Sequence, residues 1–397
     1  MSVNRTILFT TIFLFILQAC AQKEAPQLAE YSEIIAGDQR LNEYLPLIND
    51  KKVGIVANQS SVIGNTHIVD TLLHSNVHIV KIFSPEHGFR GNQDAGTLIG
   101  GSTDSVTGIR IISLYGKHKK PNQEDLEGTD VVLFDLQDAG VRFYTYVSTL
   151  TYVMEACAEH GIPVIVLDRP NPNSFYVDGP LLEEEFSSFV GMHKVPIVYG
   201  MTIGEYALMV NGEGWLRTKQ ECKLTVIKMR NYNRNMIVKL PVKPSPNLPD
   251  WQAVYLYPSL CLFEGTVMSV GRGTDLPFQI YGHPDFTAGN FAFTPKPLPG
   301  ATNSKYEGVT CYGQNLITYA DNFAGNPPLL NLTWLIESYK SLSPNHEFFT
   351  TYFDKLAGTD KLRKQIINGL TEEDIRKSWE SGLKTFENIR QKYLIYE

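Results

Sequence analysis

The chain of 397 residues is too long for one ordinary core, and its 43% hydrophobic and 19% charged residues are typical of a globular protein and not of a disordered one. A formal net charge of -7 argues against nucleic acid as a partner, because phosphate binding needs clustered Lys and Arg. The 20 Tyr and 20 Phe mostly fill cores, although aromatic faces also stack on sugar rings.

The first 20 residues have the features of an export signal. An apolar run at residues 6–17 follows Arg5 and is too short for a stable membrane anchor. The LQAC sequence that ends at Cys20 resembles a bacterial lipobox. We therefore expect residues 1–20 to be a signal peptide with a lipidated Cys20 and residues 21–38 to be a tether. The protein is then exported to the periplasm and anchored to a membrane by that lipid, and a plain signal peptide cut nearby is the alternative.

Alternating apolar and amphipathic segments predict a parallel α/β domain over residues 39–240. In chain order, strands are expected at residues 52–57, 77–83, 110–114, 129–136, 162–167 and 224–229. Helices are expected at residues 67–73, at residues 145–160, which close at Gly161, and at residues 202–211, which open with a capping box. This spacing favours parallel strand–helix–strand units with helices on both faces of the sheet.

A proline-rich segment marks the predicted domain boundary. Residues 241–250 (PVKPSPNLPD) carry four prolines and do not form regular structure. Beyond them, residues 241–397 mix helical and extended patterns, which predicts a smaller α+β subdomain. Its expected elements lie at residues 255–263, 277–281, 329–339 and 371–392.

Three of the predicted strands end in clusters of polar side chains. The clusters are Glu86, His87 and Arg90, then Asp135, Asp138 and Arg142, then Asp168, Arg169, Asn171 and Asn173. In an open α/β sheet, ligands bind beyond the carboxyl ends of the strands, so we expect these side chains to meet. With Tyr144 and Tyr146 beside them, they form the usual lining of a carbohydrate pocket. For one acid alone, helix capping or a turn-pinning ion pair, such as Glu86 with Arg90, is the simpler interpretation. The three clusters together favour a site.

The second domain offers Glu264 and Arg272, which we expect to reach over the first domain. The glycines beside Arg272 are weak support for phosphate binding, because no six-residue fingerprint surrounds them. The first strand is followed by Asn58 and polar residues and not by glycines, which argues against a nucleotide site. The sequence contains no GxSxG or Walker motif, so ordinary serine hydrolases and NTPases are disfavoured, and no cofactor is expected.

The remaining cysteines and histidines do not predict a metal site. Neither CxxC nor His-x-His spacing occurs, so we expect no structural metal. Four cysteines lie in apolar surroundings far apart in the sequence, and we expect them to be mostly buried thiols: Cys157, Cys222, Cys261 and Cys311.

Five ordered motifs carry a resemblance to a known family. They are residues 84–91 (SPEHGFRG), 135–146 (DLQDAGVRFYTY), 167–172 (LDRPNP), 199–205 (YGMTIGE) and 269–274 (SVGRGT). Together they resemble the bacterial exo-β-N-acetylmuramidases of the NamZ type, over roughly residues 40–397. The resemblance implies a Rossmann-like first subdomain, a smaller second one and a cleft between them. It also implies release of N-acetylmuramic acid from the non-reducing end of peptidoglycan fragments, with the catalytic glutamate at Glu86 and with His87 beside it.

We therefore predict a glycosidase of peptidoglycan-derived muramyl glycans, active in cell-wall turnover and muropeptide recycling. The predicted catalytic residues are Glu86, His87 and Asp138, with Glu86 as the general acid. The predicted substrate-binding residues are Arg90, Arg142, Tyr144, Asp168, Arg169, Asn171, Glu264 and Arg272.

The remaining roles are open at the level of sequence. The second catalytic group is Asp138, Asp168, Glu264 or the substrate's own acetamido group. The arginine that pairs with the lactyl carboxylate is Arg142, Arg169 or Arg272. Another cell-wall hexosaminidase and a non-catalytic glycan-binding lipoprotein are the alternative functions.

Overall fold

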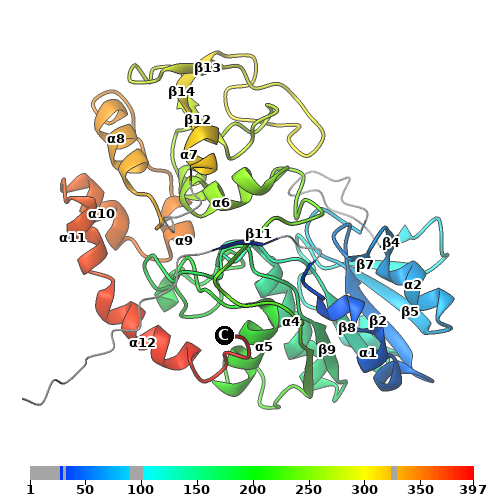
Figure 1. The fold of residues 1–397 in the computed structure, drawn as a ribbon. Coiled ribbons are helices and arrows are strands. Elements are labelled where there is room, and N and C mark those ends of the chain that lie inside the picture. The colour runs from blue at the N-terminus through cyan, green and yellow to red at the C-terminus, as the bar shows by residue number, and fades with distance from the viewer. Residues whose placement is uncertain (1–26, 30–32, 90–101, 323–328) are drawn as a thin grey trace, which may run out of the picture.

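The computed structural model describes residues 27–29, 33–89, 102–322 and 329–397 (Figure 1). Its largest element is a seven-stranded sheet. In spatial order the strands are β10 (Leu224–Ile227), β9 (Val164–Leu167), β8 (Val131–Asp135), β2 (Lys52–Ala57), β5 (His78–Ser84), β7 (Arg110–Ser113) and β6 (Ser102–Thr103). All neighbours pair in parallel except β6 and β7, which are antiparallel. The predicted parallel α/β fold is confirmed.

Both faces of the central sheet are covered, which explains why its strands are almost wholly apolar. Neighbouring residues of a strand point to opposite faces. Val132 and Phe134 of β8 belong to one hydrophobic cluster with α4 (Tyr146–Glu159) and α5 (Ile203–Gly212). Val131 and Leu133 belong to a second cluster with α1 (Leu41–Ile48) and α2 (Ile68–His74). The predicted helices on both faces are therefore present.

The predicted helix ends agree closely with the structure. At the end of α4, Gly161 adopts a positive φ of 69°, as a helix-terminating glycine does. At the start of α5, Thr202 and Glu205 form the predicted capping box. The remaining elements of the first part are η2 (Gly37–Gln39), β3 (Val62–Ile63), β4 (Thr66–His67), α3 (Gln123–Leu126), η3 (Glu184–Phe186) and β11 (Met236–Val238).

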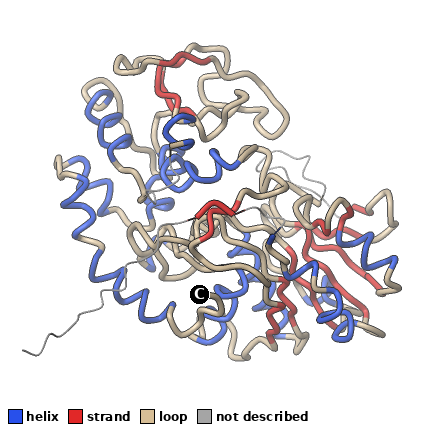
Figure 2. The backbone as a smooth tube through the Cα atoms, in the orientation of Figure 1, coloured by secondary structure: helices blue, strands red, loops and turns tan. Residues whose placement is uncertain are grey.

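The C-terminal part combines a small antiparallel sheet with helices, as predicted. The sheet has the order β12 (Ile280–His283), β14 (Cys311–Asn315) and β13 (Phe291–Phe293). Figure 2 shows these strands standing apart from the central sheet. The helices are α6 (Trp251–Leu260), η4 (Cys261–Gly265), α7 (Ile317–Asp321), α8 (Thr333–Leu342), α9 (Phe353–Ala357), α10 (Lys361–Ile367), α11 (Glu372–Lys377) and α12 (Glu380–Arg390).

The C-terminal end of the chain returns to the first part of the molecule (Figure 1). The hydroxyl of Tyr396 donates to Asp168 Oδ2 at 2.7 Å, and the backbone N–H of Ile395 donates to Glu205 Oε1 at 2.8 Å. One hydrophobic cluster also contains buried residues of both parts. The two predicted domains therefore share a core, and the chain crosses between them twice.

The segment predicted as a tether contributes to the fold from its last residues. Residues 27–29 form β1 (Gln27–Ala29), which pairs in parallel with β11. Ile34 is buried, and the buried carboxylate of Asp38 pairs with Arg169 at 2.9 Å. Residues 33–38 therefore belong to the folded body. The predicted signal peptide and Cys20 lie outside the described residues.

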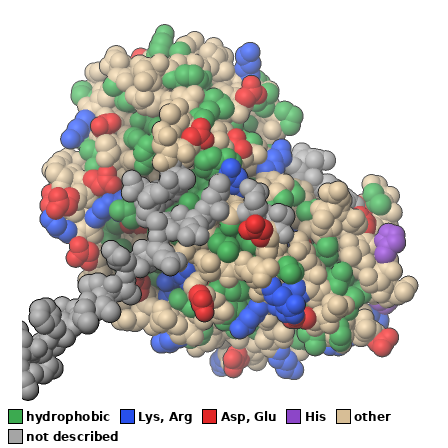
Figure 3. Space-filling model, in the orientation of Figure 1, with side chains coloured by type: hydrophobic (Ala, Val, Ile, Leu, Met, Phe, Trp, Pro, Cys, Tyr) green, Lys and Arg blue, Asp and Glu red, His purple; other side chains and the backbone are tan. Residues whose placement is uncertain are grey.

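All four cysteines from Cys157 onward are free and buried, as predicted. On the face shown in Figure 3, acidic and basic side chains are interspersed and form no large patch of one sign. Among the described residues, no helix has the length and apolar character needed to cross a membrane.

Candidate active site

A pocket of about 640 Å³ lies between the two parts of the molecule. This is within the size range of small-ligand sites, roughly 300–1,000 Å³. From the first part it is lined by Glu86, His87, Tyr115, Lys119, Phe143, Tyr144, Thr145, Tyr146, Phe189 and Val190. From the second part it is lined by residues that include Asn247, Tyr257, Cys261, Glu264, Met268, Arg272, Phe278, Lys305 and Tyr352.

Glu86 lies on the pocket wall directly after β5 and is partly exposed. Its Oε2 accepts a hydrogen bond from Thr145 Oγ1 at 2.9 Å. Tyr115 also lines the pocket, and burial together with the nearby Glu86 carboxylate raises the pKa of Tyr115. The carboxyl group is therefore held by the Thr145 hydroxyl group on the pocket wall.

The backbone after Glu86 is held in an uncommon conformation. His87 has φ of 70° and Gly88 has φ of 75°, so two successive residues are left-handed. For His87 this conformation is sterically costly, and such strain is concentrated at functional sites. The turn places both Glu86 and His87 on the pocket wall. The catalytic role of each stays a prediction.

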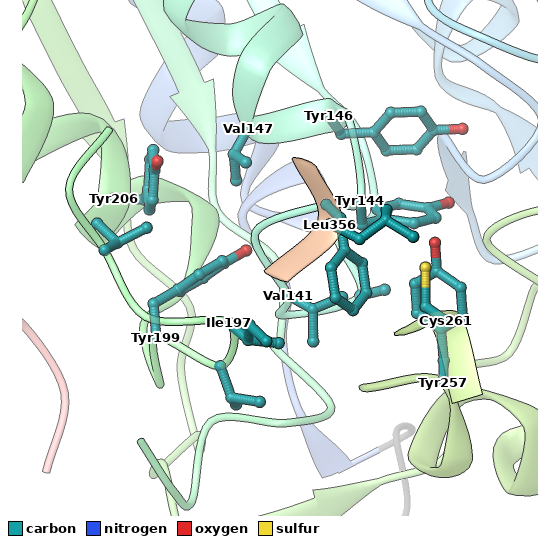
Figure 4. Close-up of a cluster of buried hydrophobic side chains, with 14 of the residues drawn as sticks. Val141, Tyr144, Tyr146, Val147, Ile197, Tyr199, Tyr206, Tyr257, Cys261 and Leu356 are labelled. Atoms are coloured by element: carbon teal, nitrogen blue, oxygen red, sulfur yellow. The ribbon is translucent and has the colours of Figure 1, made fainter. Parts of the chain in front are cut away.

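Aromatic rings form one side of the pocket. Tyr144 and Tyr146 pack edge to face with centroids 4.7 Å apart, and Figure 4 shows their hydroxyl groups pointing the same way. Tyr257 packs against Tyr144 at 6.1 Å and against Phe278 at 4.8 Å. Tyr144 is buried, and its hydroxyl donates to the carbonyl of Pro244 at 2.8 Å. These rings give the pocket apolar surface of the kind on which a sugar ring stacks.

Glu264 and Arg272 line the pocket from the C-terminal part, and they pair with each other. Arg272 donates to both carboxylate oxygens of Glu264, at 2.6 and 3.0 Å. The guanidinium carbon also lies 4.9 Å from the centroid of the Phe278 ring. Burial acts to lower the pKa of Arg272, but the paired Glu264 carboxylate outweighs it and raises this pKa, because the two charges stabilise each other. Both side chains therefore reach the pocket as predicted, but as an ion pair.

Two lysines in the pocket lining were not predicted from the sequence. Lys305 donates to three backbone carbonyls, those of Glu264, Thr266 and Met268, at 3.2, 2.6 and 3.2 Å. The Nζ of Lys119 lies 4.6 Å from the centroid of the Phe189 ring. Within the described part of the chain, Lys119 makes this cation–π contact and no ion pair.

Asp138 does not line the pocket, which contradicts the prediction that it acts directly on substrate. It is 2% exposed and accepts hydrogen bonds from the Tyr199 hydroxyl and, at 2.9 Å, from the Gly140 backbone. Burial raises the pKa of Asp138 to about 6. Because the Asp138 carboxylate is buried against the loop at Gly140, it does not contact a sugar in the pocket.

Arg142 is also buried, at 1% exposure, and does not line the pocket. Its guanidinium donates to four backbone carbonyls at 2.7 to 3.1 Å, which are those of Pro180, Val195, Leu356 and Ala357. Burial lowers the pKa of Arg142 to about 9. The prediction that Arg142 pairs with a substrate carboxylate is wrong, because this side chain joins three segments of the protein.

The predicted binding residues after β9 form a second buried network. Arg169 donates to Asp135 at 2.6 and 2.9 Å and to Asp38 at 2.9 Å. Asp168 accepts from the Thr202 hydroxyl at 2.8 Å, in addition to Tyr396. All of these side chains except Tyr396 are buried.

Asn171 completes this network. Its Nδ2 donates to the carbonyl of Met201 at 2.7 Å, and its Oδ1 accepts from the backbone of Asn173 at 2.7 Å. The placement of Asp168, Arg169 and Asn171 therefore contradicts their predicted contact with substrate. Arg90 lies outside the described residues.

The pocket thus presents one carboxyl group held by a hydroxyl group and, from the other part, one carboxylate paired with a guanidinium. Among the described lining residues, Glu86 and Glu264 are the acids. This leaves Glu264 as the predicted second carboxylate that reaches the pocket. An acid held by a hydroxyl group beside a row of aromatic rings is suited to proton transfer onto a bound sugar.

Two family models match the chain. They are described as exo-beta-N-acetylmuramidase NamZ, N-terminal, over residues 53–252, and NamZ, C-terminal, over residues 255–396. The chain belongs to the NamZ family. The junction of the two NamZ models lies just beyond the proline-rich segment at residues 241–250.

Individual relatives support the NamZ assignment. The chain is similar to the peptidoglycan beta-N-acetylmuramidase NamZ of Bacillus subtilis strain 168, with 40% identity over 394 residues and 93% of each protein covered. It is also similar to the crystal structures of two DUF1343 family proteins from Bacteroides fragilis. The first has a TM-score of 0.84 and 43% identity, and the second has 0.79 and 29%; each match covers 92% of this chain and 99% of the other.

Proposed function

We propose that this protein is an exo-β-N-acetylmuramidase, a glycoside hydrolase that releases N-acetylmuramic acid from the non-reducing end of peptidoglycan fragments. The observation that carries the proposal is the placement of Glu86 on the pocket wall, held by Thr145. The similarity to a relative named for this activity supports it. Its role is then in cell-wall turnover and the recycling of muropeptides.

In the proposed mechanism, Glu86 donates a proton to the glycosidic oxygen as the bond to the anomeric carbon breaks. Thr145 holds the carboxyl group in one orientation, so that little reorganisation is needed during proton transfer. His87 follows on the same strained turn and is proposed to position the departing sugar.

Two routes are proposed for the attack on the anomeric carbon: either Glu264 acts as a general base for a water molecule that replaces the departing sugar, or the acetamido group of the substrate attacks first and is then displaced by water. Glu264 is already paired with Arg272, which stabilises its negative charge. Direct attack by water gives inversion, whereas attack through the acetamido group gives retention. The anomeric configuration of the first product, read by NMR before mutarotation, separates retention from inversion.

Recognition of the lactyl carboxylate of muramic acid is proposed to involve Lys119. Arg142 and Arg169 are buried in structural networks, and Arg272 is paired with Glu264. Lys119 lines the pocket with its ammonium above Phe189, and an ammonium in that position can meet a carboxylate. Pairing of Lys119 with the lactyl group favours muramyl over glucosaminyl substrates.

The proposal is tested with two chromogenic glycosides that share one leaving group, a β-N-acetylmuraminide and a β-N-acetylglucosaminide. We expect turnover of the muraminide and at least about tenfold lower kcat/KM on the glucosaminide. Digestion of defined muropeptides, followed by mass spectrometry, is expected to yield free N-acetylmuramic acid from the non-reducing end. Preferential cleavage of the glucosaminide indicates another hexosaminidase, and binding without turnover indicates a glycan-binding protein.

We further propose that the protein is exported to the periplasm and anchored to a membrane by a lipid on Cys20. The apolar run at residues 6–17 and the LQAC sequence support this proposal. Cells grown with radioactive palmitate are expected to label the wild-type protein and not a Cys20→Ser variant. Equal labelling of both, or of neither, contradicts lipidation at Cys20.

A further inference from the structure

Tyr352 is the most exposed of the aromatic residues in the described lining of the pocket. It lines the pocket from the C-terminal part and is 40% exposed. Tyr115 and Phe189 are partly buried, and the other lining rings are buried, namely Phe143, Tyr144, Tyr146, Tyr257 and Phe278. The buried rings pack mainly against protein, whereas a ring that is exposed inside a pocket has surface left for a ligand.

The helix that begins at Tyr352 is fixed to the first part of the molecule. The backbone N–H of Leu356 donates to the carbonyl of Tyr352 at 3.2 Å, so the two residues lie on one face of α9. Leu356 also lines the pocket. The buried guanidinium of Arg142 donates to the carbonyls of Leu356 and Ala357 at 3.1 and 2.7 Å. These bonds hold the end of α9, and they keep the face with Tyr352 toward the pocket.

The start of α9 packs directly on the segment that carries Glu264. A Cβ atom added to Gly265 would lie 2.4 Å from the Cα of Phe353, so this close approach of two backbones requires a glycine. The backbone N–H of Thr350 donates to the carbonyl of Gly265 at 2.9 Å. Contacts before and after Tyr352 in the sequence therefore hold it next to the segment of Glu264.

The phenol group of Tyr352 lies within electrostatic range of both acids of the pocket. Partial burial raises the pKa of Tyr352. Four ionisable neighbours raise it further, which are Cys261, Glu264, Glu86 and Tyr115. A tyrosine at a distant rim, which is the simpler interpretation, does not have both acids within range. Tyr352 therefore lies close to the point where the two parts of the molecule present their carboxyl groups.

We propose that Tyr352 is a substrate-binding residue and, on the basis of the proposed function, that its ring stacks on the N-acetylmuramic acid unit beside the bond that is cleaved. A sugar ring has apolar C–H faces, and stacking on an aromatic ring removes these faces and the ring from water. The contact is made by the ring, so the hydroxyl group is not required for it. Tyr352 thereby helps to hold the sugar between Glu86 and Glu264.

The test compares Tyr352→Ala, which removes the ring, with Tyr352→Phe, which removes only the hydroxyl group. The control is Tyr312→Ala, because Tyr312 is 49% exposed on β14 and is not among the described lining residues. Steady-state kinetics on the chromogenic β-N-acetylmuraminide give kcat and KM separately, and thermal melts give Tm. Tyr352 is exposed at the start of its helix, so both of its variants are expected to fold.

We expect KM of Tyr352→Ala to rise about tenfold while kcat stays within about threefold of the wild type, because a contact made equally before and during bond breaking affects binding and not the chemical step. Tyr352→Phe and Tyr312→Ala are expected to stay within about threefold of the wild type in both constants. The Tm of all three variants is expected to stay close to that of the wild type.

Three results overturn the assignment of Tyr352. They are an unchanged KM in Tyr352→Ala, an equal rise of KM in Tyr352→Phe, which assigns the effect to the hydroxyl group, and a fall of kcat together with Tm in Tyr352→Ala, which assigns a structural role. Turnover by the wild type with any of these results leaves the proposed function standing. Absence of turnover by the wild type contradicts the proposed function and the stacking role together.

Discussion

The end of β5 and the ends of β8 and β9 carry the same kinds of residue but have different surroundings. At the end of β5, Glu86 is partly exposed on a pocket wall and accepts a hydrogen bond from the Thr145 hydroxyl. At the ends of β8 and β9, Asp138 and Arg169 are buried. Arg169 pairs with Asp135 and Asp38, and Asp138 accepts a hydrogen bond from the Tyr199 hydroxyl. Because burial keeps both side chains away from the pocket, position at a strand end does not by itself define a site.

The largest expected effect is the loss of activity when Glu86 is replaced, and it distinguishes Glu86 from the buried residues Asp138 and Arg169. Glu86→Gln keeps the shape of the side chain but removes the acidic proton, so kcat on a natural disaccharide is expected to fall about 10²- to 10⁴-fold. The Tm is expected to stay close to that of the wild type, because Glu86 lies on a pocket wall. Steady-state kinetics and thermal melts measure both quantities. A large loss of Tm with little loss of kcat contradicts the catalytic assignment.

The opposite pattern is expected for Arg169. Arg169→Met leaves the buried carboxylates of Asp38 and Asp135 without their positive partner, and the free energy of unfolding is expected to fall by about 3–5 kcal/mol. The control is Arg230→Met, which breaks a pair between Glu43 and a side chain that is 63% exposed, and its cost is expected to stay below about 1 kcal/mol. Denaturant titration compares the two. Equal costs contradict a specific role for the buried network.

Burial of Asp138 also predicts that the free energy of unfolding depends on pH. Burial raises the pKa of Asp138 from 3.8 to about 6, so between these values the folded chain keeps a proton that the unfolded chain releases. The contribution of Asp138 to the free energy of unfolding therefore falls as pH rises from about 4 to about 6, by about 3 kcal/mol in total.

In the Asp138→Asn variant this contribution is absent, and the stability curve is expected to be flatter over the same pH range. The exposed carboxyl of Asp321 provides the control variant, Asp321→Asn. Denaturant titrations at a series of pH values measure the curves. If the curves of the wild type and Asp138→Asn stay parallel between pH 4 and pH 6, the buried carboxyl does not titrate as described.

The smallest expected effect concerns Lys119. Lys119→Met keeps much of the contact with Phe189 but removes the charge proposed to meet the lactyl carboxylate. We expect KM for the muraminide to rise about three- to tenfold, with little change on the glucosaminide. Lys117→Met is the control, because Lys117 is exposed in the same loop and outside the pocket lining. An equal rise for both glycosides contradicts recognition of the lactyl group.

The sheet was predictable because its signal is local. Residues of β8 and β9 are apolar on both faces, and caps such as Thr202 with Glu205 lie within one turn of their helix. The end of β5 was predictable for a related reason, since Pro85 and Gly88 mark a turn beside an acid. Local chemistry therefore defines both the elements and one of the three strand ends.

The burial of the other strand ends was not predictable, because distant segments cover them. Arg142 is enclosed by carbonyls at residues 180, 195, 356 and 357, and Asp168 is capped by Tyr396. Sequence spacing contains no information on these contacts. Lys119 was missed for the converse reason: a lysine in a basic loop has the same local pattern whether it faces solvent or a pocket.

The most direct test of the central claim, that Glu86 is the proton donor, compares two substrates of the Glu86→Gln variant. One is a muramyl disaccharide, whose departing sugar needs a proton, and the other is a dinitrophenyl muraminide, whose leaving group needs none. The account predicts a loss in kcat/KM on the disaccharide at least about a hundredfold larger than the loss on the dinitrophenyl glycoside. Equal losses on both substrates, or full activity on the disaccharide, contradict it.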